Sequence, residues 1–249
     1  MCPATPVRYL RRVVTPELRT QMWLAGAVVG AAYGVFLIAV AVSSPAGAAL
    51  TGQFAGQPVA KALMAVLLAA AAAAHPVVRE RRWLVAALLF SALGDFLLAI
   101  PWWEPSFVGG LGAFLVAHVC FLGALIPLWS PSPVRLTAAA AVVVSCIALL
   151  IWFWPNLAEQ GLTVPVVLYI TVLGAMVCAA LMARLPTLST AVGAVCFAVS
   201  DSMIGISEFV RHDQLLAVPI WWAYAAAMVM ITAGLLFRRT SVRPAELVR

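Results

Sequence analysis

The sequence predicts an all-α fold, a bundle of about eight membrane-spanning helices, and three observations lead to this prediction. Of the 249 residues, 65% are hydrophobic and only 10% are charged, whereas soluble domains are about half apolar and about a quarter charged. The apolar residues form long runs, most of them close to the roughly 20 residues that a helix needs to cross a bilayer. The segments between the runs are short, so we expect the whole chain, residues 1–249, to form a single transmembrane domain.

The apolar runs predict eight spans in chain order. The first follows a basic stretch, as the core of a signal peptide would. It is longer than such a core, which has about 7–15 residues, so we expect a retained helix. The second is short and rich in alanine, and small residues let helices approach one another closely. The predicted spans are approximately residues 21–42, 58–74, 83–100, 107–129, 134–154, 162–182, 188–207 and 215–237.

Turn-forming residues and tryptophans mark the ends of these spans. The segments SSPAG, PWWEPS, SPSP and PNLAEQG precede the second, fourth, fifth and sixth spans, and they are rich in proline, glycine and serine. Tryptophan is enriched where a helix meets the membrane–water interface. Seven tryptophans cluster at predicted span ends: Trp102, Trp103, Trp129, Trp152, Trp154, Trp221 and Trp222.

The net charge of +6 is distributed as expected for a membrane protein. Arginines occupy the N-terminus, every second loop and the C-terminus: Arg8, Arg11, Arg12, Arg19, Arg79, Arg81, Arg82, Arg135, Arg184, Arg238, Arg239, Arg243 and Arg249. The alternate loops carry Glu104, Glu159 and Asp213, with Arg211 as the one arginine. Basic loops favour the cytoplasmic side, so we expect a cell-membrane protein with both termini cytoplasmic and an even number of spans. Anionic lipid explains this charge, and we expect no nucleic-acid partner.

Several kinds of site are not indicated by the sequence. Of the five cysteines, Cys120, Cys146, Cys178 and Cys196 lie inside predicted spans, and no CxxC pair occurs, so we expect neither a disulfide framework nor a zinc knuckle. The sequence contains no GxSxG, P-loop or GxGxxG motif, which disfavours acyl-serine chemistry and nucleotide-driven work.

Two aspartates interrupt long apolar stretches. Asp95 lies in LLFSALGDFLLAIP and Asp201 lies in AVCFAVSDSMIGIS. An ionisable group at the centre of a span costs about 2.5–3.5 kcal/mol on insertion scales, and it usually marks a functional site. A buried contact that only fixes helix packing is the structural alternative, although serine or asparagine would provide it at lower cost.

Other polar residues lie at similar predicted depths in the outer half of the membrane. At a rise of 1.5 Å per residue, Lys61 of the second span and His118 of the fourth can lie at depths that overlap those of both aspartates. Ser91 lies one turn before Asp95, and the remaining candidates near Asp201 are Ser200, Glu208 and Tyr224. We expect one shared polar cavity, because separate polar groups facing lipid would be costly. The simpler alternatives are an interfacial Lys61 or Glu208 and a purely structural His118.

The two aspartate segments also suggest an internal repeat. The same sequence interval separates Asp95 from His118 and Asp201 from Tyr224. The third and seventh spans, which carry the aspartates, are expected to run in the same direction. Parallel repeats are known in membrane folds, so two parallel four-helix halves are a possible arrangement of the chain.

At these residues the sequence resembles the YhhN family of membrane proteins, which includes the lysoplasmalogenases. The resemblance is carried by Lys61-Ala62-Leu63-Met64, by Gly94-Asp95, by FVGGLGAFLVAH ending at His118, and by Ser200-Asp201. It covers the chain from about Lys61 to the last span, and the usual Lys-Pro is Lys61-Ala62 here. The resemblance implies an eight-span protein that hydrolyses the vinyl ether bond of lysoplasmalogens to a fatty aldehyde and a glycerophospho-alcohol.

That reaction needs an acid and a group that activates water, and Asp95 and Asp201 are our candidates for these two roles. Lys61 is expected to keep one carboxylate ionised or to contact phosphate, and His118 to orient water or bind the headgroup. The expected partners are a lyso-ether-lipid substrate and membrane lipids, without a cofactor or metal ion and with no particular oligomeric state predicted.

Other functional classes remain open at the sequence level. One is a metal-dependent lysolipid hydrolase, with Asp95, His118 and Asp201 as zinc ligands. Another is a proton-coupled transporter in which the aspartates form a relay. A lipid-binding or structural membrane protein would show neither catalysis nor transport.

Overall fold

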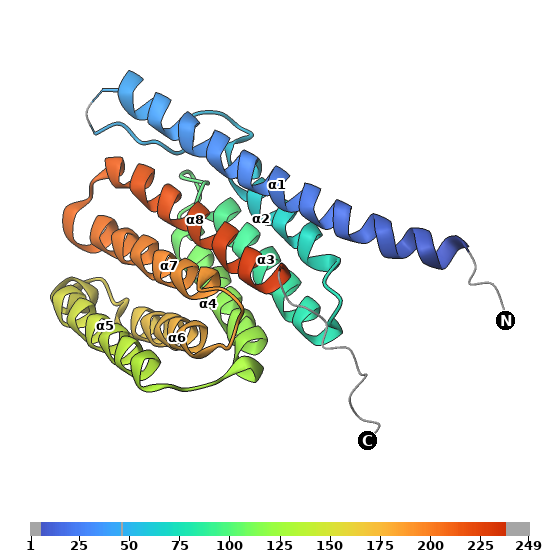
Figure 1. Ribbon diagram of the computed structural model, residues 1–249. Helices are drawn as coiled ribbons and strands as arrows, with labels where there is room; N and C mark the ends of the chain where they lie inside the picture. The colour runs from blue at the N-terminus through green and yellow to red at the C-terminus, as the bar shows by residue number, and fades with distance from the viewer. Residues whose placement is uncertain (1–5, 46, 238–249) are drawn as a thin grey trace.

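Each predicted span is helical in the computed structural model, which describes residues 6–45 and 47–237, with side chains from residue 17 (Figure 1). The eight α-helices are α1 (Pro6–Ser43), α2 (Gln57–Ala73), α3 (Val78–Leu97), α4 (Ser106–Leu125), α5 (Pro133–Glu159), α6 (Thr163–Met182), α7 (Ser189–Ile206) and α8 (Ala217–Leu236). Short helical turns η1 (Ile126–Leu128), η2 (Ser207–Arg211) and η3 (Gln214–Leu216) extend α4 and join α7 to α8. No β-strand occurs within the described ranges.

The helix boundaries agree with the predicted spans except at the starts of α1 and α3 and the ends of α4 and α5. α3 begins at Val78 rather than at residue 83, and α4 ends at Leu125, where η1 follows. α1 begins well before residue 21, within the basic segment. α5 continues through Pro155 to Glu159, whereas the predicted span ends at residue 154. Proline removes one helical hydrogen bond, yet helices in a membrane bundle tolerate it where neighbouring groups compensate. The start of α5 is conventional, because Pro133 follows Ser132, whose hydroxyl accepts a hydrogen bond from the amide of Arg135 at 3.4 Å.

Six helical segments are long and apolar enough to cross a membrane, as in a multi-pass membrane protein. They are Glu17–Ser43, Ser106–Leu128, Pro133–Glu159, Thr163–Met182, Ser189–Arg211 and Gln214–Leu236. α2 is apolar but has only 17 residues. α3 carries a run of charged residues from Arg79 to Arg82 in its first turn and Asp95 near its other end, which lowers its mean hydropathy.

The helices pack in neighbouring pairs, and the pair formed by α5 and α6 lies at one edge of the bundle (Figure 1). α1 lies at the opposite edge and contacts α2 and α8. Between these edges, α3 and α4 pack closely together, as do α7 and α8. The core contains the fully buried side chains of Phe121, Phe197 and Met228.

Small residues bring the helices together beside both aspartates. At Gly94 a Cβ atom would lie 2.6 Å from the ring of Phe114, so only glycine permits this approach of α3 to α4. The hydroxyl of Ser200 donates a hydrogen bond to the carbonyl of Ile220 on α8 at 3.0 Å. Each contact precedes an aspartate by one residue and therefore fixes the position of its backbone.

Candidate functional site

A polar cavity of about 270 Å³ opens where α2, α3, α7 and α8 meet. Its lining includes Lys61 of α2, Asp95 of α3, Asp201 of α7 and Tyr224 of α8. The structure thus brings both aspartates and the lysine to one space, although they are far apart in the sequence. The sequence candidates on its wall are Lys61, Asp95, Ser200, Asp201, Glu208 and Tyr224.

Asp95 is only 2% exposed and is held by a tyrosine from another helix. The Tyr224 hydroxyl donates a hydrogen bond of 2.7 Å to Oδ2 of Asp95. The carboxyl also lies within electrostatic reach of Lys61 and Asp201. A buried carboxyl requires such partners, because the desolvation of an uncompensated charge is costly.

Asp201 has two partners that meet at the same oxygen atom. The Tyr169 hydroxyl on α6 donates a hydrogen bond of 2.6 Å to Oδ2 of Asp201. Nε2 of His118, on α4, lies 3.5 Å from this oxygen, and the His118 side chain is 1% exposed. α7 therefore presents Asp201 to groups from both α4 and α6.

The orientation of the His118 ring is fixed by its own helix. Nδ1 lies 2.6 Å from the carbonyl oxygen of Phe114. Because a carbonyl can only accept a hydrogen bond, we infer that Nδ1 carries a proton. Nε2 then faces Oδ2 of Asp201.

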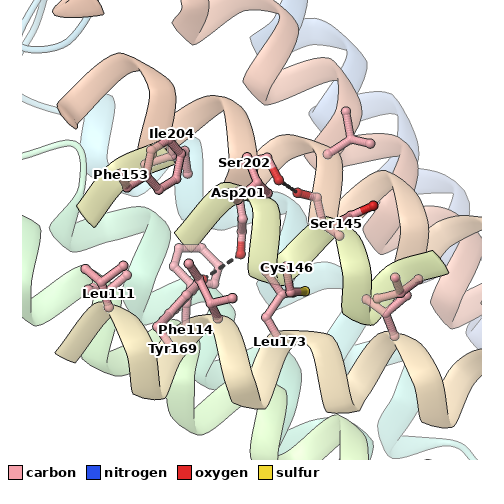
Figure 2. A pocket seen from close by; sticks show the side chains of 18 of the residues that line it. Leu111, Phe114, Ser145, Cys146, Phe153, Tyr169, Leu173, Asp201, Ser202 and Ile204 are labelled. Carbon is pink, nitrogen blue, oxygen red and sulfur yellow. Dashed lines mark hydrogen bonds between the residues drawn. The ribbon is translucent and has the colours of Figure 1, made fainter. Parts of the chain in front are cut away.

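A second cavity, of about 280 Å³, lies between α4, α5, α6 and α7 and is almost entirely apolar (Figure 2). Figure 2 shows Asp201 and its hydrogen bond to Tyr169 at the wall of this cavity, near Phe114, Cys146 and Leu173. Asp201 also lines the polar cavity, so the two cavities share a wall at this residue. The residues common to both linings are Leu98, Phe107, Phe114, Asp201 and Ile204.

The remaining sequence candidates have more peripheral positions. Ser91 is fully buried one turn before Asp95 and does not line either cavity. Ser200 reaches the polar cavity, but its hydroxyl is bonded to α8. Glu208 is exposed at the edge of the polar cavity, in the π-helical turn η2. Lys61 is half-buried and lies on the cavity wall.

Sequence reasoning missed Tyr169, the partner of Asp201, and a buried amide, Gln57. Tyr169 interrupts the apolar run VPVVLYITVL, where a hydroxyl would need a partner; this was the available signal. Gln57 is fully buried and donates hydrogen bonds to the hydroxyl of Tyr33 at 3.0 Å and the carbonyl of Leu50 at 2.9 Å. Since Tyr33 lines the polar cavity, Gln57 ties the loop between α1 and α2 to its wall.

The surroundings of the aspartates also bear on whether they could bind a metal ion. Across the described ranges, no group of three or more His, Cys, Asp or Glu side chains is arranged to hold a metal ion. His118 instead directs one ring nitrogen to a backbone carbonyl and the other to a carboxylate.

Comparisons with known proteins give a consistent result. The chain is 59% identical over 227 residues to proteins named lysoplasmalogenase from Mycobacterium bovis and Mycobacterium tuberculosis, covering 90% of this chain and 87% of each relative. It is 32% identical over 152 residues to lysoplasmalogenase TMEM86B of Mus musculus, covering 60% of this chain and 62% of the mouse protein. No solved structure gives a significant match. The sequence profile of the YhhN family matches residues 56–235, a range that contains both aspartates and their partners, and the chain belongs to this family.

Proposed function

We propose that this protein is a membrane-embedded hydrolase that cleaves the vinyl ether bond of lysoplasmalogens. The observation that carries the proposal is the position of Asp201, which borders both a polar and an apolar cavity while a second buried carboxyl, Asp95, lines the polar one. A lysolipid has the same division into a charged headgroup and one hydrocarbon chain. The names of the mycobacterial and mouse relatives support this substrate class.

The proposed reaction consumes one water molecule and releases a fatty aldehyde and a glycerophospho-alcohol. An acid protonates the β-carbon of the vinyl ether, and an oxocarbenium ion forms at the carbon bonded to oxygen. Water adds to that carbon and gives its proton to a base, so the proton that was spent is recovered. The hemiacetal hydroxyl then loses its proton as the aldehyde carbonyl forms, and the bond to the glycerol oxygen breaks while that oxygen takes up a proton and leaves as the alcohol. Two positioned carboxyls can supply the acid and the base.

The two carboxyls have different surroundings. Asp201 borders the hydrocarbon-like cavity and therefore lies beside the expected position of the vinyl ether. Tyr169 and His118 both meet its Oδ2 atom, so a proton can be held or exchanged there. Asp95 faces only the polar cavity, where water and headgroup are expected. We propose that the two residues share the acid and base roles.

Lys61 is the proposed contact for the phosphate of the headgroup. It lies on the wall of the polar cavity, within electrostatic reach of Asp95. An ammonium group is a compact charge that suits phosphate. The apolar cavity would hold the alkenyl chain, because such a lining offers a hydrocarbon a favourable environment.

We further propose that all eight helices cross the membrane and that the chain consists of two equivalent four-helix halves, α1–α4 and α5–α8. The partners of the aspartates support this repeat. Asp95 of the first half meets Tyr224 of the second, and Asp201 of the second half meets His118 of the first. Since His118 and Tyr224 follow their respective aspartates at the same interval, the two contacts are reciprocal, as in a structure with approximate two-fold symmetry.

The helix contacts beside the aspartates also occupy equivalent positions in the two halves. Gly94 packs on Phe114 within the first half, and Ser200 bonds to Ile220 within the second. The two pairs have equal spacing in the sequence. The repeat therefore relates the packing of the helices as well as the charged groups.

The decisive experiment is aldehyde release by purified Asp95→Asn and Asp201→Asn variants, followed by mass spectrometry. Each variant should lose at least about 100-fold in kcat, since a positioned acid or base contributes about 10²–10⁴-fold. Glu104→Gln is the matched control, because Glu104 is an exposed carboxyl in the loop between α3 and α4.

Two results would contradict this proposal. Wild-type rates in a correctly folded Asp95→Asn or Asp201→Asn variant would remove that aspartate from the chemistry. Release of fatty acid from ester lysolipids, with no aldehyde from the vinyl ether, would show that the protein hydrolyses ester bonds instead.

A further inference from the structure

A shallow apolar groove runs along the outer face of the bundle between α5 and α7. On α5 it is lined by Ser145, Ala148, Leu149 and Trp152. On α7 it is lined by Val199, Ser202, Met203 and Ile206. Because α5 and α6 form the edge of the bundle, no further helix of the described chain covers this face (Figure 1).

The groove and the apolar cavity are two sides of one thin wall. Ser145 and Leu149 of α5 and Val199 and Ser202 of α7 line both spaces. Figure 2 shows Ser145 and Ser202 on this side of the cavity, with Asp201 next to Ser202. A single layer of side chains therefore separates the outer face from the cavity that contains the reactive carboxyl.

The chemistry of the wall suits a hydrocarbon. The Ser145 hydroxyl donates to the carbonyl of Ala141 at 2.9 Å, and the Ser202 hydroxyl donates to the carbonyl of Ala198 at 2.6 Å. Both hydroxyls are thus satisfied by their own helices. The other lining residues of the groove are apolar, with the indole of Trp152 half-exposed at one end.

α5 contacts α7 beside the groove, where the ring of buried Phe153 lies against Gly205. Its buried residues are Ala139, Phe153 and Leu157, and the four residues that line the groove are not among them. Its main packing partner is α6. The exposed groove side chains of α5, such as Trp152, can therefore change conformation without displacing the buried residues of this helix.

We propose that this groove is a lateral entrance through which the alkenyl chain of a membrane-resident lysolipid passes from the bilayer into the apolar cavity. The inference rests on the proposed function and specifies the route of its substrate. The chain enters sideways between α5 and α7, while the headgroup enters the polar cavity and the ether bond comes to lie at Asp201. The substrate does not have to leave the membrane to reach the carboxyls.

The test uses Ala148→Trp, because Ala148 is exposed and lines the groove but not the inner cavity. An indole there fills the entrance and leaves the reactive site unchanged. Ala140→Trp is the matched control, since Ala140 is exposed on the same helix and lines neither space. In vesicles, Ala148→Trp should lower kcat/KM for a long-chain lysoplasmalogen by at least about tenfold, an effect of the size typical for a disturbed apolar pocket. A short-chain, water-soluble analogue should react at the control rate.

Equal rates for Ala148→Trp and Ala140→Trp on the long-chain substrate would overturn the proposal. An equal loss on both substrates would also overturn it, because the effect would then lie in the reactive site.

A second measurement separates the route from the reaction. A saturated ether lysolipid with a photoactivatable diazirine in its chain should label peptides of α5 and α7, less in Ala148→Trp than in Ala140→Trp. If this labelling pattern appears but wild-type protein releases no aldehyde, the entrance is supported and the proposed hydrolysis is wrong. Equal labelling of Ala148→Trp and Ala140→Trp would overturn the proposed entrance, whether or not the protein releases aldehyde.

Discussion

Each of the two buried aspartates receives a hydrogen bond from a tyrosine on another helix. Tyr224 bonds to Asp95 and Tyr169 bonds to Asp201, at 2.7 and 2.6 Å. Hydrogen bonds to charged groups contribute about 1.5–3 kcal/mol, more than neutral ones. The phenols therefore offset part of the cost of placing carboxyls in an apolar bundle, and they also fix the direction of each carboxyl.

We predict that Tyr169→Phe lowers kcat for aldehyde release by about 10- to 100-fold, which corresponds to the loss of one hydrogen bond to a charged group. KM should change less, because the hydroxyl acts on Asp201 and the ring that lines the apolar cavity is retained. Steady-state kinetics of the purified variant provide the measurement. The control is Thr171→Val, since this exposed α6 hydroxyl bonds only to its own helix at Val167. Wild-type kinetics in Tyr169→Phe would mean that Asp201 does not depend on this partner.

Only part of the candidate site was predictable from individual residues. Asp95, Asp201 and Lys61 were identifiable because charge inside an apolar span is costly, and the structure brings them to one cavity. The apolar run around Tyr169 indicates that its hydroxyl needs a partner, but it does not indicate which helix provides that partner, so the contact with Asp201 was not predictable. Ser91 was selected for its spacing alone, and it lies outside both cavities.

At the level of helices, sequence and structure agree well. Continuous apolar runs separated by Pro, Gly and charged residues predicted all eight helices, because most of these runs are close to the length that a bilayer requires. The end of α5 was misplaced because PNLAEQG, which begins at Pro155, was predicted to be a loop, whereas its first residues continue the helix. Helix pairing was not predictable, because the apolar residues of α3, α6 and α8 show little helical periodicity and do not mark one face.

Close approach between α3 and α4 provides a prediction about stability. Gly94→Ala should destabilise the protein by about 1–3 kcal/mol, the usual cost of overpacking, because its methyl group would collide with the Phe114 ring. Aldehyde release should fall as well, since Phe114 lines both cavities. Thermal unfolding in detergent, followed by tryptophan fluorescence, would show a lower Tm.

Gly112→Ala is the matched control for this helix pair. Gly112 lies on α4, where an added Cβ meets no atom within 4 Å. Alanine is a better helix former than glycine, so Tm should stay constant or rise. A lower Tm in Gly112→Ala than in Gly94→Ala would contradict the assigned contact.

For the whole molecule, the start of α1 and the end of α8 lie at the same side of the bundle (Figure 1). This arrangement agrees with an even number of crossings. The arginine distribution predicts that the loop between α4 and α5 faces the cytoplasm and the loop between α5 and α6 faces outward. The two cavities are also properties of the whole molecule, because their walls are assembled from helices that are distant in the chain.

The orientation can be tested with single cysteines in a variant that lacks the native ones. Gln160→Cys and Pro131→Cys place thiols at exposed positions in these two loops. A membrane-impermeant maleimide should label Gln160→Cys in intact cells and Pro131→Cys only after lysis. The opposite pattern would invert the orientation, and labelling of both in intact cells would contradict the placement of α5 across the membrane.

Phe114 contributes both to the wall between the two cavities and to the orientation of His118. Its ring occupies the space over Gly94 and separates the polar cavity from the apolar one, while its carbonyl holds Nδ1 of His118. The ring and the carbonyl belong to one residue of α4, so a boundary between the two cavities and the orientation of the imidazole depend on the same backbone position. A change that shifts the α4 backbone at Phe114 is therefore expected to move the imidazole together with this part of the boundary.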